Sequence, residues 1–183
     1  MSVLTAPNQL TLFRLLLVPC LVIFVLYGFN GMALVAFTVA GVTDALDGLI
    51  ARRTGQRTAL GAWLDPMADK LLLVSTFVVL TMPLGLPNQL PLWFTVLVIS
   101  RDVCIVLTVA VVNLAIERRV FYPSVLGKIT TVLYIITGAV TLFFNYMDQK
   151  SVLVDLMVYA ALVFTVASGL HYIVHAARLV NDG

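Results

Sequence analysis

The segment VTDALDGLIARRTGQRTALGAWLDPMADK, residues 42–70, has the most informative pattern of charged residues in this chain. It places four aspartates and four basic residues in a chain that otherwise avoids charge, because only 11% of the 183 residues are charged. Soluble proteins carry about 25% charged residues. The sequence on either side consists of long apolar runs. Residues 42–70 are therefore a polar segment within a chain that is otherwise suited to lipid.

The composition predicts that lipid surrounds much of the chain. Hydrophobic residues make up 61% of the sequence, and the mean hydropathy is +1.06. A globular protein of this size cannot hide so much apolar surface from water. This excludes a soluble enzyme, a nucleic-acid-binding module and a disordered tail. Cys20 and Cys104 are far apart in apolar runs, so we expect no disulfide and interpret both as core residues.

Stretches without Asp, Glu, Lys or Arg predict the membrane spans. They cover residues 15–43, 71–100, 129–147 and 156–177. A span needs about 20 apolar residues, so the first two stretches must each contain a turn, which Gly, Asn and Pro residues mark. We expect six helices near residues 8–28, 31–53, 61–82, 91–116, 124–146 and 152–178. The predicted fold is an all-α integral membrane bundle of six transmembrane helices, with residues 1–183 as a single domain.

Basic residues predict the orientation. Seven of them fall at or beside the connections on one side, namely Arg52, Arg53, Arg57, Arg118, Arg119, Lys128 and Arg178, whereas only Lys150 appears on the other. The positive-inside rule places the basic side and both termini in the cytoplasm. No Lys or Arg precedes the first apolar run, so we expect no cleavable signal. The expected location is a bacterial-type inner cell membrane, crossed several times, with the polar residues facing the cytoplasm.

The four aspartates have spacings that bring them together. Asp44 and Asp47 share a helix face at i, i+3, and Asp65 and Asp69 share one at i, i+4. A short polar turn joins the two helices, so the pairs can converge near the cytoplasmic surface. Their mutual repulsion would be offset by divalent cations, because carboxylates and substrate phosphates are common magnesium ligands. Two such ions about 4 Å apart form a known arrangement for attack at phosphorus.

Small and basic residues around the aspartates fit a phosphate-bearing ligand. Gly48 and Ala51 each lie four residues after an aspartate, and Gly61 lies four residues before Asp65. Small side chains leave room for a bulky ligand near the backbone. Arg52 and Arg57 can supply cations for phosphate oxygens, and Thr58 can add a hydroxyl donor. The sequence thus predicts a polar, metal-containing cavity at the cytoplasmic side of the bundle.

These residues resemble the signature of the CDP-alcohol phosphatidyltransferases. The pattern is Asp44-x2-Asp47-Gly48-x2-Ala51-Arg52-x8-Gly61-x3-Asp65-x3-Asp69, without departure. The segment PNQLTLFRLLLVP, residues 7–19, resembles the start of the phosphatidylglycerophosphate synthases of that family.

The resemblance implies a reaction and a set of roles. A phosphatidyl group would pass from CDP-diacylglycerol to an acceptor hydroxyl, with release of CMP. Asp44, Asp47, Asp65 and Asp69 would hold one or two Mg²⁺ or Mn²⁺ ions, with two expected here, and Asp69 would also act as the general base. The residues around CDP-diacylglycerol would be Asn8, Thr11, Arg14, Gly48, Ala51, Arg52, Thr58 and Gly61. Family members are commonly homodimers, so the resemblance also implies a homodimer.

The acceptor is open at this point. Arg101 and Lys128 resemble the acceptor-phosphate residues of the family, which would suit a small phosphorylated alcohol such as sn-glycerol 3-phosphate. The segments ISRDV (residues 99–103) and FNYMD (residues 144–148) look more like the cardiolipin synthases of the same family, whose acceptor is phosphatidylglycerol. Arg101 could instead simply pair with Asp102 or with a neighbouring helix.

Two other classes of protein could use an acidic cluster in a helical bundle. A divalent-cation transporter needs polar residues through the full membrane thickness, whereas the outer half of these spans is nearly free of charge. The interleaved glycines and arginines also suit a diphosphate better than a permeating cation. A noncatalytic membrane scaffold would leave the aspartates without a purpose. The enzyme is the favoured hypothesis.

Overall fold

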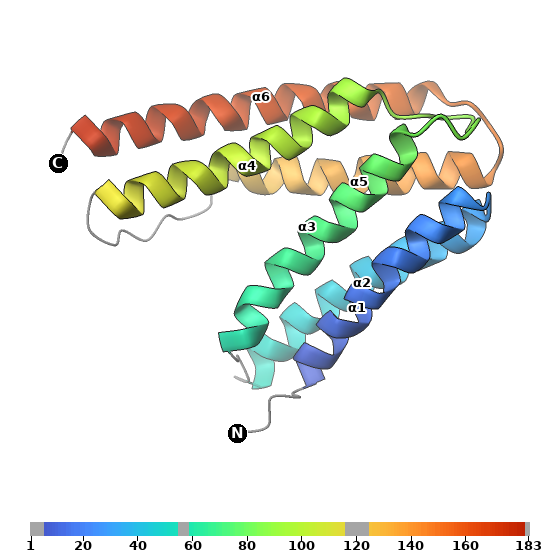
Figure 1. Cartoon of the computed structure of the whole chain (residues 1–183), viewed down its shortest axis with the longest axis horizontal. Coiled ribbons are helices and arrows are strands. Elements are labelled where there is room, and N and C mark those ends of the chain that lie inside the picture. The colour runs from blue at the N-terminus through green and yellow to red at the C-terminus, as the bar shows by residue number, and fades with distance from the viewer. Residues whose placement is uncertain (1–5, 55–58, 116–124, 182–183) are drawn as a thin grey trace. The chain divides into compact units, whose positions relative to one another are not determined.

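The structure is a computed structural model of the whole chain. It describes the backbone of residues 6–54, 59–115 and 125–181, and the side chains of residues 9–46, 64–107, 125–170 and 172. The regular structure in these ranges is entirely α-helical. The six helices are α1 (Ala6–Leu26), α2 (Asn30–Thr54), α3 (Ala59–Thr81), α4 (Leu92–Ala115), α5 (Val125–Tyr146) and α6 (Val152–Asn181), as Figure 1 shows.

The six predicted helices are confirmed, each with its ends within three residues of the expected positions. The turns occur where glycine allows them. Gly28, between α1 and α2, has a φ of 76°, and Gly85, between α3 and α4, has a φ of 71°. Glycine adopts such positive φ values without the strain that a Cβ would cause. These two residues therefore explain why the long uncharged stretches divide into separate helices.

The helices carry many large apolar side chains on the outside. Leu16 on α1 is 67% exposed, and Val163 on α6 is 64% exposed. Three helical segments in the described part of the chain are long and apolar enough to cross a membrane, namely Gln9–Leu26, Val125–Tyr146 and Val152–Leu170. The apolar part of α2, Asn30–Leu46, is shorter. These features are those of a multi-pass membrane protein, while six full spans stay a prediction.

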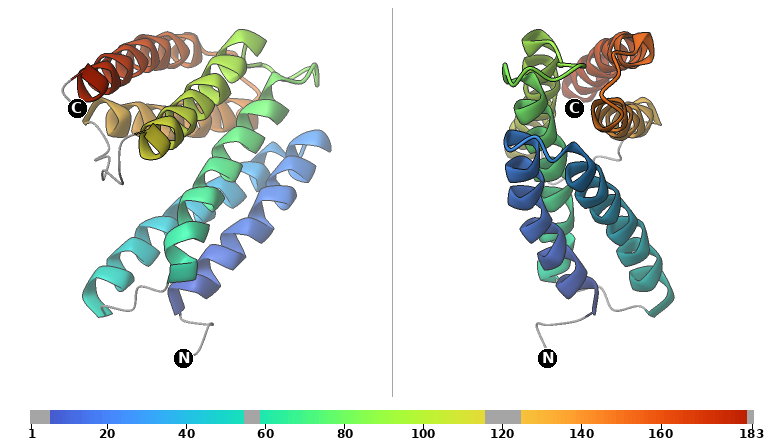
Figure 2. Two further views of the ribbon diagram at one scale, coloured as in Figure 1. Left: turned by 60° about the vertical axis from the view of Figure 1, so that its left-hand side comes forward. Right: turned by 90° about the vertical axis from the view of Figure 1, so that its right-hand side faces the viewer.

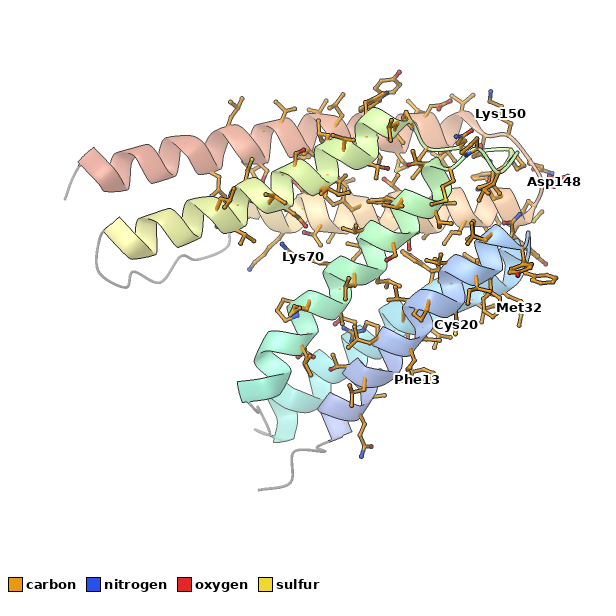
Figure 3. All side chains as sticks on the ribbon, viewed as in Figure 1. Phe13, Cys20, Met32, Lys70, Asp148 and Lys150 are labelled. Carbon is orange, nitrogen blue, oxygen red and sulfur yellow. The ribbon has the colours of Figure 1, made fainter. Side chains whose placement is uncertain are left out.

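Cys20 and Cys104 are both exposed, so the prediction that they are core residues is wrong. Figure 3 marks Cys20 on α1. The inference from an apolar run to a buried position holds in water, but lipid also accepts apolar side chains. An apolar residue in a membrane helix therefore faces lipid as readily as the interior.

Small polar side chains fill much of the helix-packed interior. Thr76, Thr130 and Thr137 are buried, and each hydroxyl donates to the carbonyl four residues earlier, at 2.7, 2.8 and 2.7 Å. This bond satisfies the hydroxyl within its own helix, so a buried threonine needs no water. Small residues also let helices approach closely in a membrane. An apolar exterior around a partly polar interior is the arrangement that lipid, rather than water, favours.

The chain divides into two compact units. Unit 1 comprises Met1–Gln89 and Gly138–Ser151, and unit 2 comprises Leu90–Thr137 and Val152–Gly183. Within unit 1, α1 packs against both α2 and α3, and α1 and α3 lie side by side in the views of Figure 2. Within unit 2, α4 packs against α6. Unit 1 contains the aspartates of residues 42–70.

A pair of asparagines ties the loops of unit 1 together. The Asn145 side chain accepts hydrogen bonds from the backbone and side-chain nitrogens of Asn88, at 2.8 and 3.2 Å, and donates to the Asn88 carbonyl at 3.1 Å. Asn88 in turn donates to the Gln149 carbonyl at 2.7 Å and accepts from the Ser151 backbone at 2.8 Å. Figure 3 labels Asp148 and Lys150 in the loop that follows α5.

We expect Asn145→Ala to destabilise the protein by about 1–3 kcal/mol, because it leaves the buried backbone groups of Asn88 without partners. Thermal unfolding in detergent should show a lower midpoint. Gln149→Ala is the matched control, since Gln149 contributes its backbone carbonyl and keeps it in the variant. An equal loss in both variants would contradict this explanation.

Candidate functional site

The candidate site forms around Arg14, which comes from α1 and has a side chain with 0% exposure. Its Nη1 donates to Asp69 Oδ1 on α3 at 2.6 Å and lies 3.0 Å from Asp44 Oδ1 on α2. A buried guanidinium is costly unless carboxylates pair with it. One arginine therefore joins three helices of unit 1 and draws two of the predicted aspartates to a single nitrogen.

Thr11 makes a second link between α1 and α3. Its hydroxyl, which belongs to a fully buried residue, donates to Asp65 Oδ1 at 2.6 Å. Thr11 and Arg14 thus contact Asp65 and Asp69 in the same order along both helices. Because successive residues of α1 meet successive residues of α3, the two helices run parallel and these contacts fix their register.

Two of the aspartates that contact Arg14 are partly exposed. The Asp44 side chain is 46% exposed and the Asp69 side chain is 43% exposed. Each carboxylate has two oxygens and about four acceptor positions, so a bond to Oδ1 leaves others available. Within this described group, one guanidinium faces the three carboxylates of Asp44, Asp65 and Asp69. Its charge alone therefore does not balance theirs.

The chemistry of these side chains fits a hard divalent cation, because carboxylate oxygens are the ligands that magnesium prefers. Among the residues with described side chains, no three His, Cys, Asp or Glu residues form a ready metal-binding group. The fourth predicted ligand, Asp47, has a side chain outside the described residues. Two observations therefore support a metal here: the ligands are carboxylate oxygens, and Asp44 and Asp69 approach the same nitrogen, Nη1 of Arg14.

Several predicted substrate contacts have side chains outside the described residues. They are Asn8, Gly48, Ala51, Arg52, Arg57, Thr58 and Gly61. Their roles stay predictions. Thr11 and Arg14, which the resemblance assigned to CDP-diacylglycerol, both lie buried against aspartates instead of on an exposed surface.

The predicted acceptor residues belong to unit 2. Arg101 on α4 donates from Nη1 to Asp102 Oδ1 at 2.8 Å and from Nη2 to Ser168 Oγ on α6 at 3.2 Å. The pairing with Asp102 that the sequence left as an alternative therefore occurs. The Arg101 side chain is only 12% exposed, and its Nε has no hydrogen-bond partner in the described part of the chain. Lys128, in the first turn of α5, is exposed.

Sequence reasoning missed some partners of these charges. It did not connect Thr11 and Arg14 with the aspartates. It allowed Arg101 a partner on a neighbouring helix but did not identify Ser168. The signal for the first was present, because Thr11 and Arg14 lie one helical turn apart and so do Asp65 and Asp69. Ser168 offered no comparable signal, since a single serine in an apolar helix has many possible neighbours.

A family model for CDP-alcohol phosphatidyltransferase matches residues 4–167. This range includes most of the chain and contains all the aspartates discussed above.

Relatives with two different names are similar to the chain. A probable phosphatidylglycerophosphate synthase of Mycobacterium tuberculosis is 36% identical over 179 residues, which cover 93% of this chain and 81% of the relative. A human cardiolipin synthase (CMP-forming) is 34% identical over 164 residues, covering 79% of this chain and 53% of the relative. A cardiolipin synthase (CMP-forming) of Streptomyces coelicolor is 38% identical over 139 residues, covering 70% and 60%.

Proposed function

Because the chain belongs to the CDP-alcohol phosphatidyltransferase family, we propose that it transfers a phosphatidyl group from CDP-diacylglycerol to a phosphate-bearing alcohol and releases CMP. The observation that carries the proposal is the approach of Asp44 and Asp69 to one nitrogen of Arg14, beside the hydrogen bond from Thr11 to Asp65. These aspartates occupy the motif positions on which the resemblance depends. In this proposal the active site lies on the cytoplasmic side of a cell membrane, and the protein acts as a homodimer.

Asp44, Asp47, Asp65 and Asp69 would hold Mg²⁺ or Mn²⁺, with two ions at the site. The bound cations would supply positive charge to the diphosphate and to the departing CMP. Arg52 and Arg57 follow the first aspartate pair closely in the sequence, so they are the candidate donors to phosphate oxygens. Asn8, Thr58 and the small residues Gly48, Ala51 and Gly61 would complete the surroundings of the nucleotide.

Asp69 is the proposed general base. Its side chain is 43% exposed, so an acceptor hydroxyl can reach the carboxylate. The hydroxyl oxygen attacks the phosphorus that carries the diacylglycerol, and its proton passes to Asp69. The bond from that phosphorus to the bridging diphosphate oxygen breaks, and CMP leaves with the bridging oxygen. Holding both reactants in line contributes much of the rate in reactions of this kind.

The first candidate acceptor is sn-glycerol 3-phosphate, which would make phosphatidylglycerophosphate. Arg101 and Lys128 would then bind its phosphate. The named phosphatidylglycerophosphate synthase supports this acceptor, because its similarity extends over 93% of the chain and 81% of the relative.

Phosphatidylglycerol is the second candidate acceptor, and a groove in unit 2 favours it. The groove has a volume of about 470 Å³ and is lined by α4 and α6. Arg101 lines it together with mainly apolar or aromatic side chains, which include Trp93, Leu97, Cys104, Ile105, Val166 and Tyr172. Apolar walls beside a cation suit a phospholipid, because its acyl chain gains from burial and a water-soluble acceptor does not.

An acceptor panel tests both the reaction and the choice of acceptor. Purified protein with CDP-diacylglycerol and Mg²⁺ should release CMP with sn-glycerol 3-phosphate, with phosphatidylglycerol, or with both. If phosphatidylglycerol is the acceptor, Leu97→Trp should reduce its use more than it reduces the use of sn-glycerol 3-phosphate, because the larger ring fills the groove. The absence of CMP with every acceptor would refute the proposed enzyme.

Asp69→Asn should abolish turnover, because an amide cannot take the acceptor proton. The variant should still bind CDP-diacylglycerol, since the other three aspartates can hold one cation. CMP release and binding of the nucleotide lipid measure the two effects separately. Turnover at the rate of the unaltered protein would remove Asp69 from the chemistry.

A further inference from the structure

Thr11 and Arg14 could serve either of two roles. The resemblance places them against CDP-diacylglycerol, which requires side chains that a ligand can reach. In the structure both residues are fully buried. Their hydrogen-bonding atoms point at carboxylates of the proposed metal site, at 2.6 Å from Asp65 and 2.6 Å from Asp69.

The carboxylates have two distinct sides. Arg14 holds the Oδ1 atoms of Asp44 and Asp69 from the buried side, while nearly half of each aspartate side chain stays exposed. A bond that fixes one oxygen of a carboxylate also restricts the plane in which the other lies. Side chains that hydrogen-bond to metal ligands commonly orient those ligands in this way, and removing such a side chain weakens metal binding.

The two donors differ in what they can set. Thr11 is neutral, so its bond to Asp65 affects orientation with no change in charge. Arg14 is charged and contacts Asp44 on α2 and Asp69 on α3, so it also helps to set the distance between these two carboxylates. A guanidinium donates from one rigid planar group, whereas a lysine ammonium does so with less fixed geometry.

We propose that Thr11 and Arg14 are positioning residues, which orient Asp65, Asp69 and Asp44 from behind so that their open oxygens receive the divalent cation. This inference rests on the proposed function only in taking these aspartates as the metal ligands. It replaces direct contact with the nucleotide lipid by an action through the carboxylates.

The test measures Mn²⁺ binding without substrate, by the loss of the free Mn²⁺ signal in electron paramagnetic resonance, on the full-length protein in detergent. Thr11→Val and Arg14→Lys should each weaken Mn²⁺ binding about 10-fold or more, the range typical of such partners. Thr11→Ser keeps the hydroxyl and should retain binding. At saturating Mn²⁺, the KM for CDP-diacylglycerol should stay within about 2-fold of the original value.

Thr76→Val is the matched control, because Thr76 is a buried threonine of α3 whose hydroxyl donates to the Leu72 carbonyl. It should leave Mn²⁺ binding unchanged. If Thr11→Val and Arg14→Lys bind Mn²⁺ normally but raise the KM for CDP-diacylglycerol, they contact the substrate and the inference is overturned. If either variant unfolds, Thr11→Ser compared with Thr11→Ala decides, since both remove little volume.

Failure of this inference differs visibly from failure of the proposed function. An unaltered protein that binds no Mn²⁺ and releases no CMP refutes the proposed function itself. An unaltered protein that does both, with variants that bind Mn²⁺ equally well, refutes only the positioning role.

Discussion

The arrangement of unit 1 depends on how carboxylates are neutralised in a chain that avoids charge. Ionisable groups are expensive at membrane depth, so each needs a partner of opposite charge. Arg14 meets this need for Asp44 and Asp69 with one nitrogen, and thereby holds α1, α2 and α3 at a common point. The same contacts leave the other faces of the carboxylates open. The contacts that stabilise unit 1 therefore also shape the surface at which we propose that a cation binds.

In unit 2 the charge of Arg101 is paired in a different way. Arg101 is paired within its own helix to Asp102 and across to Ser168 on α6, beside an apolar groove. A paired guanidinium beside apolar walls is the observation that supports a lipid as the second candidate acceptor. The relatives also leave the choice of acceptor open. One is named a probable phosphatidylglycerophosphate synthase, and the others are named cardiolipin synthases.

The sequence predicted the helices well because turns in a membrane chain are marked by glycine, proline and asparagine, as at Gly28 and Gly85. The family resemblance from residues 42–70 is also confirmed. Burial was less predictable. Cys20 shows why, since hydropathy cannot separate a lipid-facing side chain from an interior one. The pairing of Thr11 with Asp65 needed the register of α1 against α3, which only the folded chain supplies.

Locating the cation itself would decide whether these aspartates form a metal site. Anomalous diffraction at the manganese edge, on protein with Mn²⁺ and CDP-diacylglycerol, should show density about 2 Å from oxygens of Asp44, Asp65 and Asp69, the distance expected for a small divalent ion. We predict that Arg14 still contacts Asp69 in that structure. Manganese bound away from these aspartates, or carboxylates turned toward separate surroundings, would contradict the assignment of Asp44, Asp65 and Asp69 as metal ligands.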